Sequence, residues 1–300
     1  ARIVTMFSFH DEPCQILDIL LTFRFQPIVP NKSVQNPNAL LNQRLIKRKP
    51  GWIDIRSDLH HFALINYAVP PERLAPHIPN GRFEIPTYDI NGQQLAMLSV
   101  VPFVDADFCF YRLFPWAKFR FPQTNFRVYV IDRATGEPVV WFFGTTLGSW
   151  VVNLARGLWR IPWHRARYEV DCKFDEDSAC TEHGRSGRYA HYQISIQSDW
   201  CNAHIDIEDT GHPVALSDEE RLVLTHPVDG YFYQLDGRVG GYSVWHDIIP
   251  LTSGKPRHLY FSLFEDLGVM NRAEMQQPYS IFLCPSISFD IYMPPKPLPV

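Results

Sequence analysis

From Trp52 onward, short segments in which apolar and polar residues alternate follow one another, with turn signals between them. This alternation has the period of two residues that a β-strand shows to its two faces. Asn91-Gly92 and Thr135-Gly136 separate neighbouring segments, and Asn-Gly favours the positive φ of a tight hairpin turn. Helices do not alternate with strands, which disfavours a parallel α/β sheet. The sequence predicts a mainly β protein, a large closed antiparallel barrel or curved sandwich with a few short helices at its ends.

Three segments have helical rather than strand spacing. In 149–159 the apolar residues recur at helical intervals, and Ser149 is a suitable N-cap. In 217–225 Ser217 and Glu220 match a capping box. The amphipathic segment 258–268 ends at a glycine. We therefore expect short helices over these three ranges.

The chain divides by composition near residue 51. Residues 1–51 contain seven Lys or Arg and three acidic residues, and they end in a basic run followed by Pro-Gly. Three interpretations remain open: a peripheral arm that packs partly on the domain, a basic tether to an anionic surface, or an upstream extension. Residues 52–300 are predicted to form a single barrel domain.

Composition excludes several classes of protein. A net charge of −4 gives no sign of nucleic-acid binding. No run of about 18 apolar residues occurs, so we expect no membrane span, and no secretory leader is recognised. The six cysteines are scattered without a CxxC pair, which indicates reduced thiols and a cytoplasmic location. Oligomeric state is left open, with a homo-oligomer as one possibility.

No cofactor or metal motif is present. The chain lacks GxGxxG after a strand, GxxxxGK[ST], HExxH and paired CxxC, so we expect no nucleotide cofactor and no zinc site. Cys201 and His204 have C-x-x-H spacing, but a second ligand pair is missing. Ser243, His246 and Asp247 are the residue types of a Ser-His-Asp catalytic triad. On one strand, however, His246 and Asp247 would face opposite ways, so a serine hydrolase is disfavoured.

The segment FPQTNFRVYV, residues 121–130, carries the most informative polar residues. Gln123, Asn125 and Arg127 share one face of the expected strand, and the opposite face is apolar or β-branched. Arg127 offers a planar fork for a carboxylate or enolate oxygen. Two interpretations compete: the polar face is exposed to water, or it lines a cavity that holds a small-molecule ligand.

Several longer motifs occur in one order along the chain. They are HHFALINYAVPPERLAPHIP (60–79), FPQTNFRVYV (121–130), GEPVVWFFGTT (136–146), LARGLWRIPWHRAR (154–167), and SLFEDLG (262–268) followed by SISFDIYMPPKP (286–297). The set resembles the YqjF-like family of uncharacterised bacterial proteins, a domain of unknown function. It is more distantly similar to the acetoacetate decarboxylase-like superfamily. The resemblance covers about Trp52 to Pro299 and implies a closed antiparallel barrel with a central cavity.

The resemblance also implies which residues would contact a ligand. Acetoacetate decarboxylases form a Schiff base on a lysine, but Thr145 and Thr146 stand at the matching place here, as candidate ligand contacts. Gln123 replaces the glutamate of the family pattern and cannot carry a proton. Asn125 and Arg127 match the family strand and would bind an anion. Schiff-base decarboxylation is therefore not expected.

One further candidate comes from the motif IPWHRAR. His164 matches the family pattern and is the candidate general acid or base, with ordering of the backbone as the alternative. Tyr129 and Trp141 would supply an apolar wall, and their alternative is ordinary core packing.

Two functions follow from these residues. The first is an enzyme for acid–base or enolate chemistry on a small or lipophilic carboxylate or dicarbonyl, such as enolisation, dehydration or cyclisation. The second is a non-catalytic binding protein for an apolar or anionic metabolite. A structural or partner-binding module is a third alternative.

Overall fold

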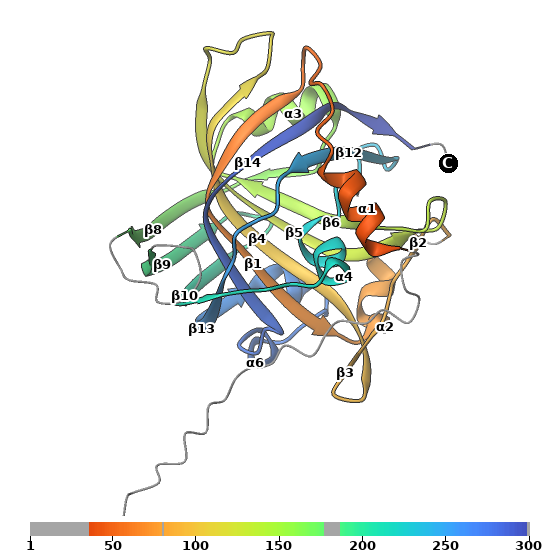
Figure 1. The fold of residues 1–300 in the computed structure, drawn as a ribbon, viewed down its shortest axis with the longest axis vertical. Helices are drawn as coiled ribbons and strands as arrows, with labels where there is room; N and C mark the ends of the chain where they lie inside the picture. Colours follow the sequence, from red (N-terminus) through yellow and green to blue (C-terminus); the bar gives the residue numbers. More distant parts are fainter. Residues whose placement is uncertain (1–35, 80, 177–186, 299–300) are drawn as a thin grey trace, which may run out of the picture.

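Seven strands close into a barrel in the computed structural model, which describes residues 36–79, 81–176 and 187–298 (Figure 1). Going round the barrel, the order is β1-β4-β5-β6-β11-β12-β14, and β14 pairs with β1 to complete it. Neighbours are antiparallel except β6 and β11. Their bounds are β1 Ile55–Val69, β4 Gln93–Phe110, β5 Phe119–Asp132, β6 Glu137–Leu147, β11 Asp229–Tyr233, β12 Val239–His246 and β14 Ser280–Pro297. The barrel expected from the alternating segments is confirmed, whereas the expectations for residues 1–35 lie outside the described residues.

A second group of strands extends the sheet beyond the barrel. β13 pairs with the N-terminal part of β14, and β10, β9 and β8 follow in that order, at the left in Figure 1. The bounds are β8 Arg167–Asp175, β9 Arg188–Gln197, β10 Ala203–Pro213 and β13 Thr252–Phe261. We call these four strands the wing. Because β14 also pairs with β1 and β12, it belongs to both the barrel and the wing.

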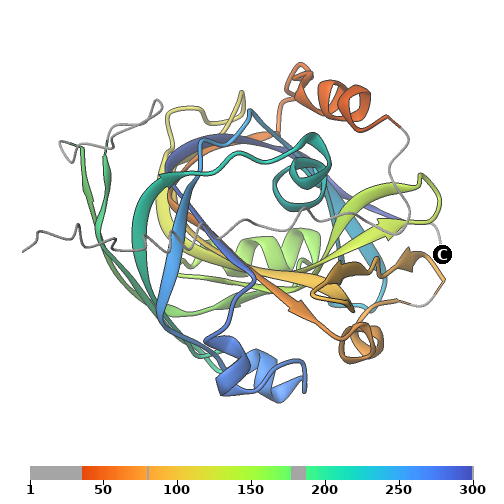
Figure 2. The same ribbon diagram turned by 60° about the horizontal axis from the view of Figure 1, so that its bottom comes forward.

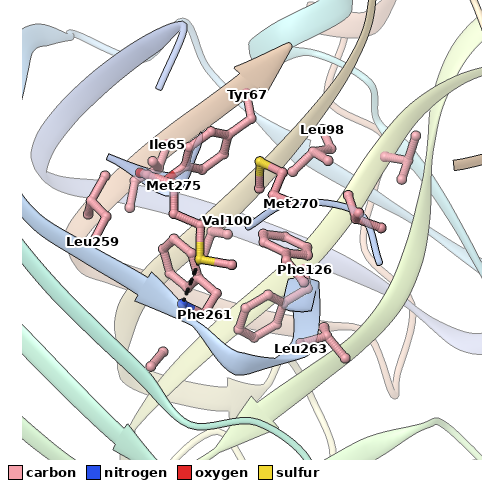
Figure 3. Close-up of a cluster of buried hydrophobic side chains, with 14 of the residues drawn as sticks. Ile65, Tyr67, Leu98, Val100, Phe126, Leu259, Phe261, Leu263, Met270 and Met275 are labelled. Atoms are coloured by element: carbon pink, nitrogen blue, oxygen red, sulfur yellow. Dashed lines mark hydrogen bonds between the residues drawn. The ribbon is translucent and has the colours of Figure 1, made fainter. Parts of the chain in front are cut away.

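Two apolar cores lie on opposite faces of the barrel strands. One fills the barrel and includes Phe121 and Tyr129 of β5. The other lies between the barrel and the wing and includes Phe126 of β5. Figure 3 shows Phe126 in this second core, where Met275 Sδ also accepts a hydrogen bond from the backbone of Phe261 at 3.3 Å. β5 is therefore buried on both faces, and the alternation in its sequence separates two interiors.

The predicted turns and caps are largely confirmed. Asn91 and Gly92 both have positive φ, at 54° and 78°, as a tight hairpin turn requires. Ser217 and Glu220 form the predicted capping box. Ser149 was wrong as an N-cap, because the helix begins at Val151 after Trp150.

The helices and the remaining strands are short. The helix expected over 258–268 is confined to its second half, because the first residues continue β13. The helical bounds are α1 Pro37–Leu45, α2 Pro71–Leu74, η1 Ala75–His77, α3 Val151–Trp159, α4 Asp218–Glu220, η2 Arg221–Thr225, α5 Ser262–Asp266 and α6 Arg272–Met275. The short strands are β2 Phe83–Glu84, β3 Tyr88–Ile90 and β7 Trp163–Arg165. Within the described parts of the chain, no helix is long and apolar enough to cross a membrane.

α1 packs against the outside of the barrel near α4 and η2 (Figure 2). Its main anchor is Arg44, which is only 6% exposed. The Arg44 guanidinium donates to the carbonyl oxygens of His226 and Pro138 and to Glu137 Oε2, the last at 3.0 Å. The described part of the N-terminal segment is thus attached to the residue that follows η2 and to the start of β6.

Candidate functional site

The barrel encloses a cavity of about 90 Å³. A water molecule needs roughly 10–15 Å³ measured in this way, so the space can hold several waters or a small organic ligand. Its walls are mostly apolar, as in most ligand pockets, and include Phe62, Phe103, Phe108, Phe142, Ile249 and Ile291. Its polar lining includes Asp105, Gln123, Asn125, Arg127, Tyr242 and His246.

The polar face of β5 points into this cavity. Gln123, Asn125 and Arg127 all line it, and Phe126 between them faces the second core. Asn125 Oδ1 accepts hydrogen bonds from Gln123 Nε2 at 3.1 Å and from Thr145 Oγ1 at 2.9 Å. These two donors fix the amide of Asn125, and its Nδ2 group remains to donate to a ligand. Thr145 acts behind Asn125, because the cavity wall includes Asn125 but not Thr145.

Arg127 is the cationic group of the cavity. Its Nε donates to Ser99 Oγ at 2.9 Å and its Nη2 to the carbonyl oxygen of Leu224 at 3.4 Å. Both acceptors are neutral, and within the described residues no carboxylate lies within 4.0 Å of the guanidinium. A half-buried guanidinium without an acidic partner is suited to an anionic ligand.

Tyr129 lies further along the same face, beside Arg127. The centre of the Arg127 guanidinium is 5.5 Å from the Tyr129 ring centroid. Tyr129 Oη is 2.8 Å from Asn66 Oδ1 and 3.2 Å from the Leu224 carbonyl oxygen, so its hydroxyl is already hydrogen-bonded. Leu224 belongs to η2, a single π-helical turn, a feature that is frequent at functional sites. Tyr129 therefore supports the position of Arg127 from outside the cavity lining.

Two predicted site residues of β6 lie on the other face of their strand. Trp141 packs in the second core, with its ring 5.5 Å from that of Phe83. Thr146 Oγ1 is 2.6 Å from Tyr168 Oη. In β6, a shift of register opposite Phe126 and Arg127 places Phe142 on the cavity side and Trp141 on the other. The apolar wall expected from Trp141 is supplied by Phe142 instead.

His164 is also turned away from the cavity. Its neighbour Trp163 lines the cavity, whereas the His164 ring stacks on Trp200 with centroids 4.2 Å apart. Burial, with a smaller contribution from the charge of Arg156, lowers the pKa of His164 to about 4. The structure does not bring His164 together with Asn125 and Arg127, and its neutral, stacked ring is consistent with a packing role.

Asp105 on β4 is a cavity residue that the sequence did not indicate. It is 2% exposed, and its Oδ1 accepts from Ser57 Oγ at 2.7 Å. Burial raises the pKa of Asp105 to about 7, although the Ser57 hydrogen bond acts in the opposite direction. The residues around it, VVPFVDADF, are largely apolar, so no pattern distinguishes this acid from one at the end of a strand.

The strand register separates Asp105 from Arg127. Ser99 pairs with Arg127, and Asp105 pairs with Phe121, six residues earlier on β5. At about 3.3 Å per residue, the two positions are about 20 Å apart along the strand. The cavity thus has a cationic end and a separate acidic end.

Tyr242 and His246 on β12 complete the polar lining. Burial raises the pKa of Tyr242, while the charge of Arg127 lowers it and that of Asp105 raises it. His246 donates from Nδ1 to the carbonyl oxygen of Asp247 at 2.8 Å, and burial lowers its pKa to about 4. Ser243, the third member of the apparent triad, instead donates to Asp229 at 2.5 Å.

The described residues offer neither a metal-binding cluster nor a lysine on the cavity wall. They contain no group of three or more His, Cys, Asp or Glu side chains placed to hold a metal ion. Cys201 is buried with a free thiol, and His204 is hydrogen-bonded to Ser195 and Gln193. No lysine is among the residues that line the cavity.

Solved structures define the class of fold. Acetoacetate decarboxylase from Legionella pneumophila aligns with a TM-score of 0.51 and 12% identity, covering 89% of this chain and 98% of that chain. An acetoacetate decarboxylase-like enzyme from Sphingomonas wittichii aligns with a TM-score of 0.51 and 10% identity, covering 85% of this chain and 94% of that chain. The enduracididine biosynthesis enzyme MppR aligns with a TM-score of 0.50 and 12% identity, covering 83% of this chain and 90% of that chain. Its structure was solved with the condensation product of pyruvate and imidazole 4-carboxaldehyde. The fold is therefore acetoacetate decarboxylase-like.

The family follows from the sequence match. Residues 56–288 match the model of DUF2071, described as an uncharacterized conserved protein, and the chain belongs to this family. A comparison with curated proteins found no match. The resemblance drawn from the ordered motifs is confirmed at the level of both family and fold.

Proposed function

We propose that this protein binds a lipophilic carboxylate inside the barrel, with the carboxylate on Arg127 and the apolar part against the aromatic walls. The observation that carries the proposal is the Arg127 guanidinium, which lines an apolar cavity and donates only to neutral oxygens. A bidentate carboxylate would neutralise this charge, and the Nδ2 group of Asn125 would orient it. The structural relatives named in connection with pyruvate and acetoacetate are consistent with this ligand class, by analogy of fold.

Arg127→Leu is expected to abolish the preference for a charged ligand. We expect the wild-type protein to bind hexanoate at least about 30-fold more tightly than hexanamide, since hydrogen bonds to a charged group contribute about 2 kcal/mol. The variant should bind the two compounds with similar affinity. Isothermal titration calorimetry on freshly purified protein, after native mass spectrometry for co-purifying ligands, measures the difference.

Arg120 provides the matched control, because it lies on the same strand but is exposed. Arg120→Leu removes the same charge and should keep the preference for hexanoate. If the wild-type protein does not distinguish hexanoate from hexanamide, Arg127 is not an anion site and the proposal fails.

Acid–base chemistry on a bound oxo acid is the second candidate function. It is favoured by the pKa of Asp105, about 7, which suits a group that gains and loses a proton near neutral pH. The expected result is exchange of the protons next to the carbonyl of an oxo acid with D₂O, at least about 10²-fold faster than in buffer. Proton NMR with pyruvate and longer oxo acids measures the rate. Exchange no faster than in buffer would leave binding as the sole function of the cavity.

A cytoplasmic location is part of this proposal. Cys109, Cys172 and Cys201 carry free thiols in the structure, which suits a reducing compartment.

A further inference from the structure

The acidic end of the cavity contains an unpartnered buried oxygen. Asp105 Oδ1 accepts from Ser57, whereas Oδ2 is buried and has no hydrogen-bond partner among the described residues. Leaving a buried polar atom without a partner is unfavourable, and such atoms are rare in native proteins. Because Asp105 lines the same cavity as Arg127, a bound ligand is one group that can satisfy this oxygen.

The space between the two polar ends is apolar along β4. Val101 and Phe103 line the cavity between the positions of Ser99 and Asp105, and their partners on β5 are the amide residues Asn125 and Gln123. The two ends are about 20 Å apart along the strands, before the inward reach of their side chains. A ligand as short as a three-carbon acid cannot touch both ends, whereas an extended chain can.

We propose that the ligand is an elongated acid with two polar ends, its carboxylate on Arg127 and a hydroxyl or carbonyl oxygen at the far end on Asp105 Oδ2. This inference rests on the proposed function, because it takes Arg127 as the carboxylate site. It adds a second recognition point and therefore a substrate class: linear carboxylates with an oxygen function at or near the terminal carbon.

The carboxyl group of Asp105 suits either kind of far-end oxygen. The pKa of Asp105 is raised to about 7 by burial, so near neutral pH both of its protonation states are populated. The protonated form donates to a carbonyl oxygen, and the ionised form accepts from a hydroxyl. A hydroxyl in the middle of the chain lies beside Val101, Phe103 and the Gln123 amide, out of reach of Asp105 Oδ2, so it lacks this contact.

The test compares alkanoates from hexanoate to decanoate with their ω-hydroxy derivatives by isothermal titration calorimetry. At one chain length the terminal hydroxyl should tighten binding by about fivefold to tenfold, the usual contribution of one hydrogen bond. The same hydroxyl placed in mid-chain cannot reach Asp105 and should give a smaller gain. This positional comparison needs only the wild-type protein, so it stands even if a variant does not fold.

Two variants separate the inference from the proposed function. Asp105→Leu should remove the advantage of the terminal hydroxyl over the unsubstituted alkanoate, while Arg127→Leu should weaken both ligands together. If alkanoates bind through Arg127 but the terminal hydroxyl gives no advantage at any length, this inference is overturned and the proposed function stands. If no alkanoate or hydroxyalkanoate binds the wild-type protein, both are overturned.

Discussion

The wild-type protein is expected to lose about 4 kcal/mol of folding stability as the pH rises from about 4 to about 7, and the Asp105→Asn variant should not show this loss. The pKa of this carboxyl group is raised from 3.8 to about 7 in the folded protein. In the unfolded chain it ionises near 3.8, so between these values the unfolded state binds fewer protons and stability falls with rising pH. A difference of about three pKa units corresponds to about 4 kcal/mol. Above about pH 7 the loss is complete.

Buried and half-buried histidines contribute a pH dependence of the opposite sign. Burial lowers the pKa of His61, His164 and His246 to about 4 and that of His226 to about 3. Their contribution is present above about pH 6.5 and is lost as the pH falls toward the folded pKa. The Asp105 effect must therefore be taken as the difference between wild type and variant.

Urea unfolding at a series of pH values measures this difference. Asp107→Asn is the matched control, because Asp107 is two residues further along β4 and exposed, with its pKa lowered by Lys118. The control should not reproduce the Asp105→Asn curve. Parallel stability curves for the wild type and Asp105→Asn would show that the folded protein does not hold this proton.

Arg44→Ala is expected to destabilise the protein by about 3 kcal/mol and to loosen α1. Removing the guanidinium leaves Glu137 and the carbonyl oxygens of His226 and Pro138 without their donor. Truncating one partner of a buried charged network costs about this much, and the partial exposure of Glu137 places the value at the low end. Denaturant unfolding measures the loss, and limited proteolysis of residues 36–51 reports the release of α1.

The same variant should weaken carboxylate binding. His226 follows directly after η2, whose Leu224 carbonyl oxygen accepts from Arg127, so α1 stabilises the acceptor that positions the cation. Arg48→Ala is the control, since Arg48 belongs to the same segment, is about half exposed, and is 3.9 Å from its ion-pair partner Asp54. Unchanged stability in Arg44→Ala would mean that α1 is not anchored through this residue.

The sequence predicted the strands well because alternation is a local signal. It placed Gln123, Asn125 and Arg127 on one face, and it identified the Asn91-Gly92 turn from the backbone freedom of those residues. Alternation could not show whether that face is exposed to solvent or enclosed. Both faces of β5 are buried, and the pattern does not tell the barrel cavity from the core between the barrel and the wing. The contacts across the barrel decide this.

The missed residues depend on long-range pairing. His164 lies on the three-residue strand β7, and its direction follows from the parallel pairing of β7 with β6, which no local pattern encodes. In β6, a shift of register opposite Phe126 and Arg127 determines that Phe142, not Trp141, faces the cavity. Asp105 is surrounded by apolar neighbours, so its burial appears only when β1 supplies Ser57.

The sharing of β14 restricts how a ligand can reach the cavity. One edge of this strand is paired with β1, and the other edge is paired with β13 and then with β12. Parting the barrel along either edge would break a long ladder of backbone hydrogen bonds and carry the wing with it. Passage of a ligand between the strands is thereby blocked along this wall. At the ends of the barrel, short helices and loops can move without breaking the sheet, which favours exchange of a ligand there.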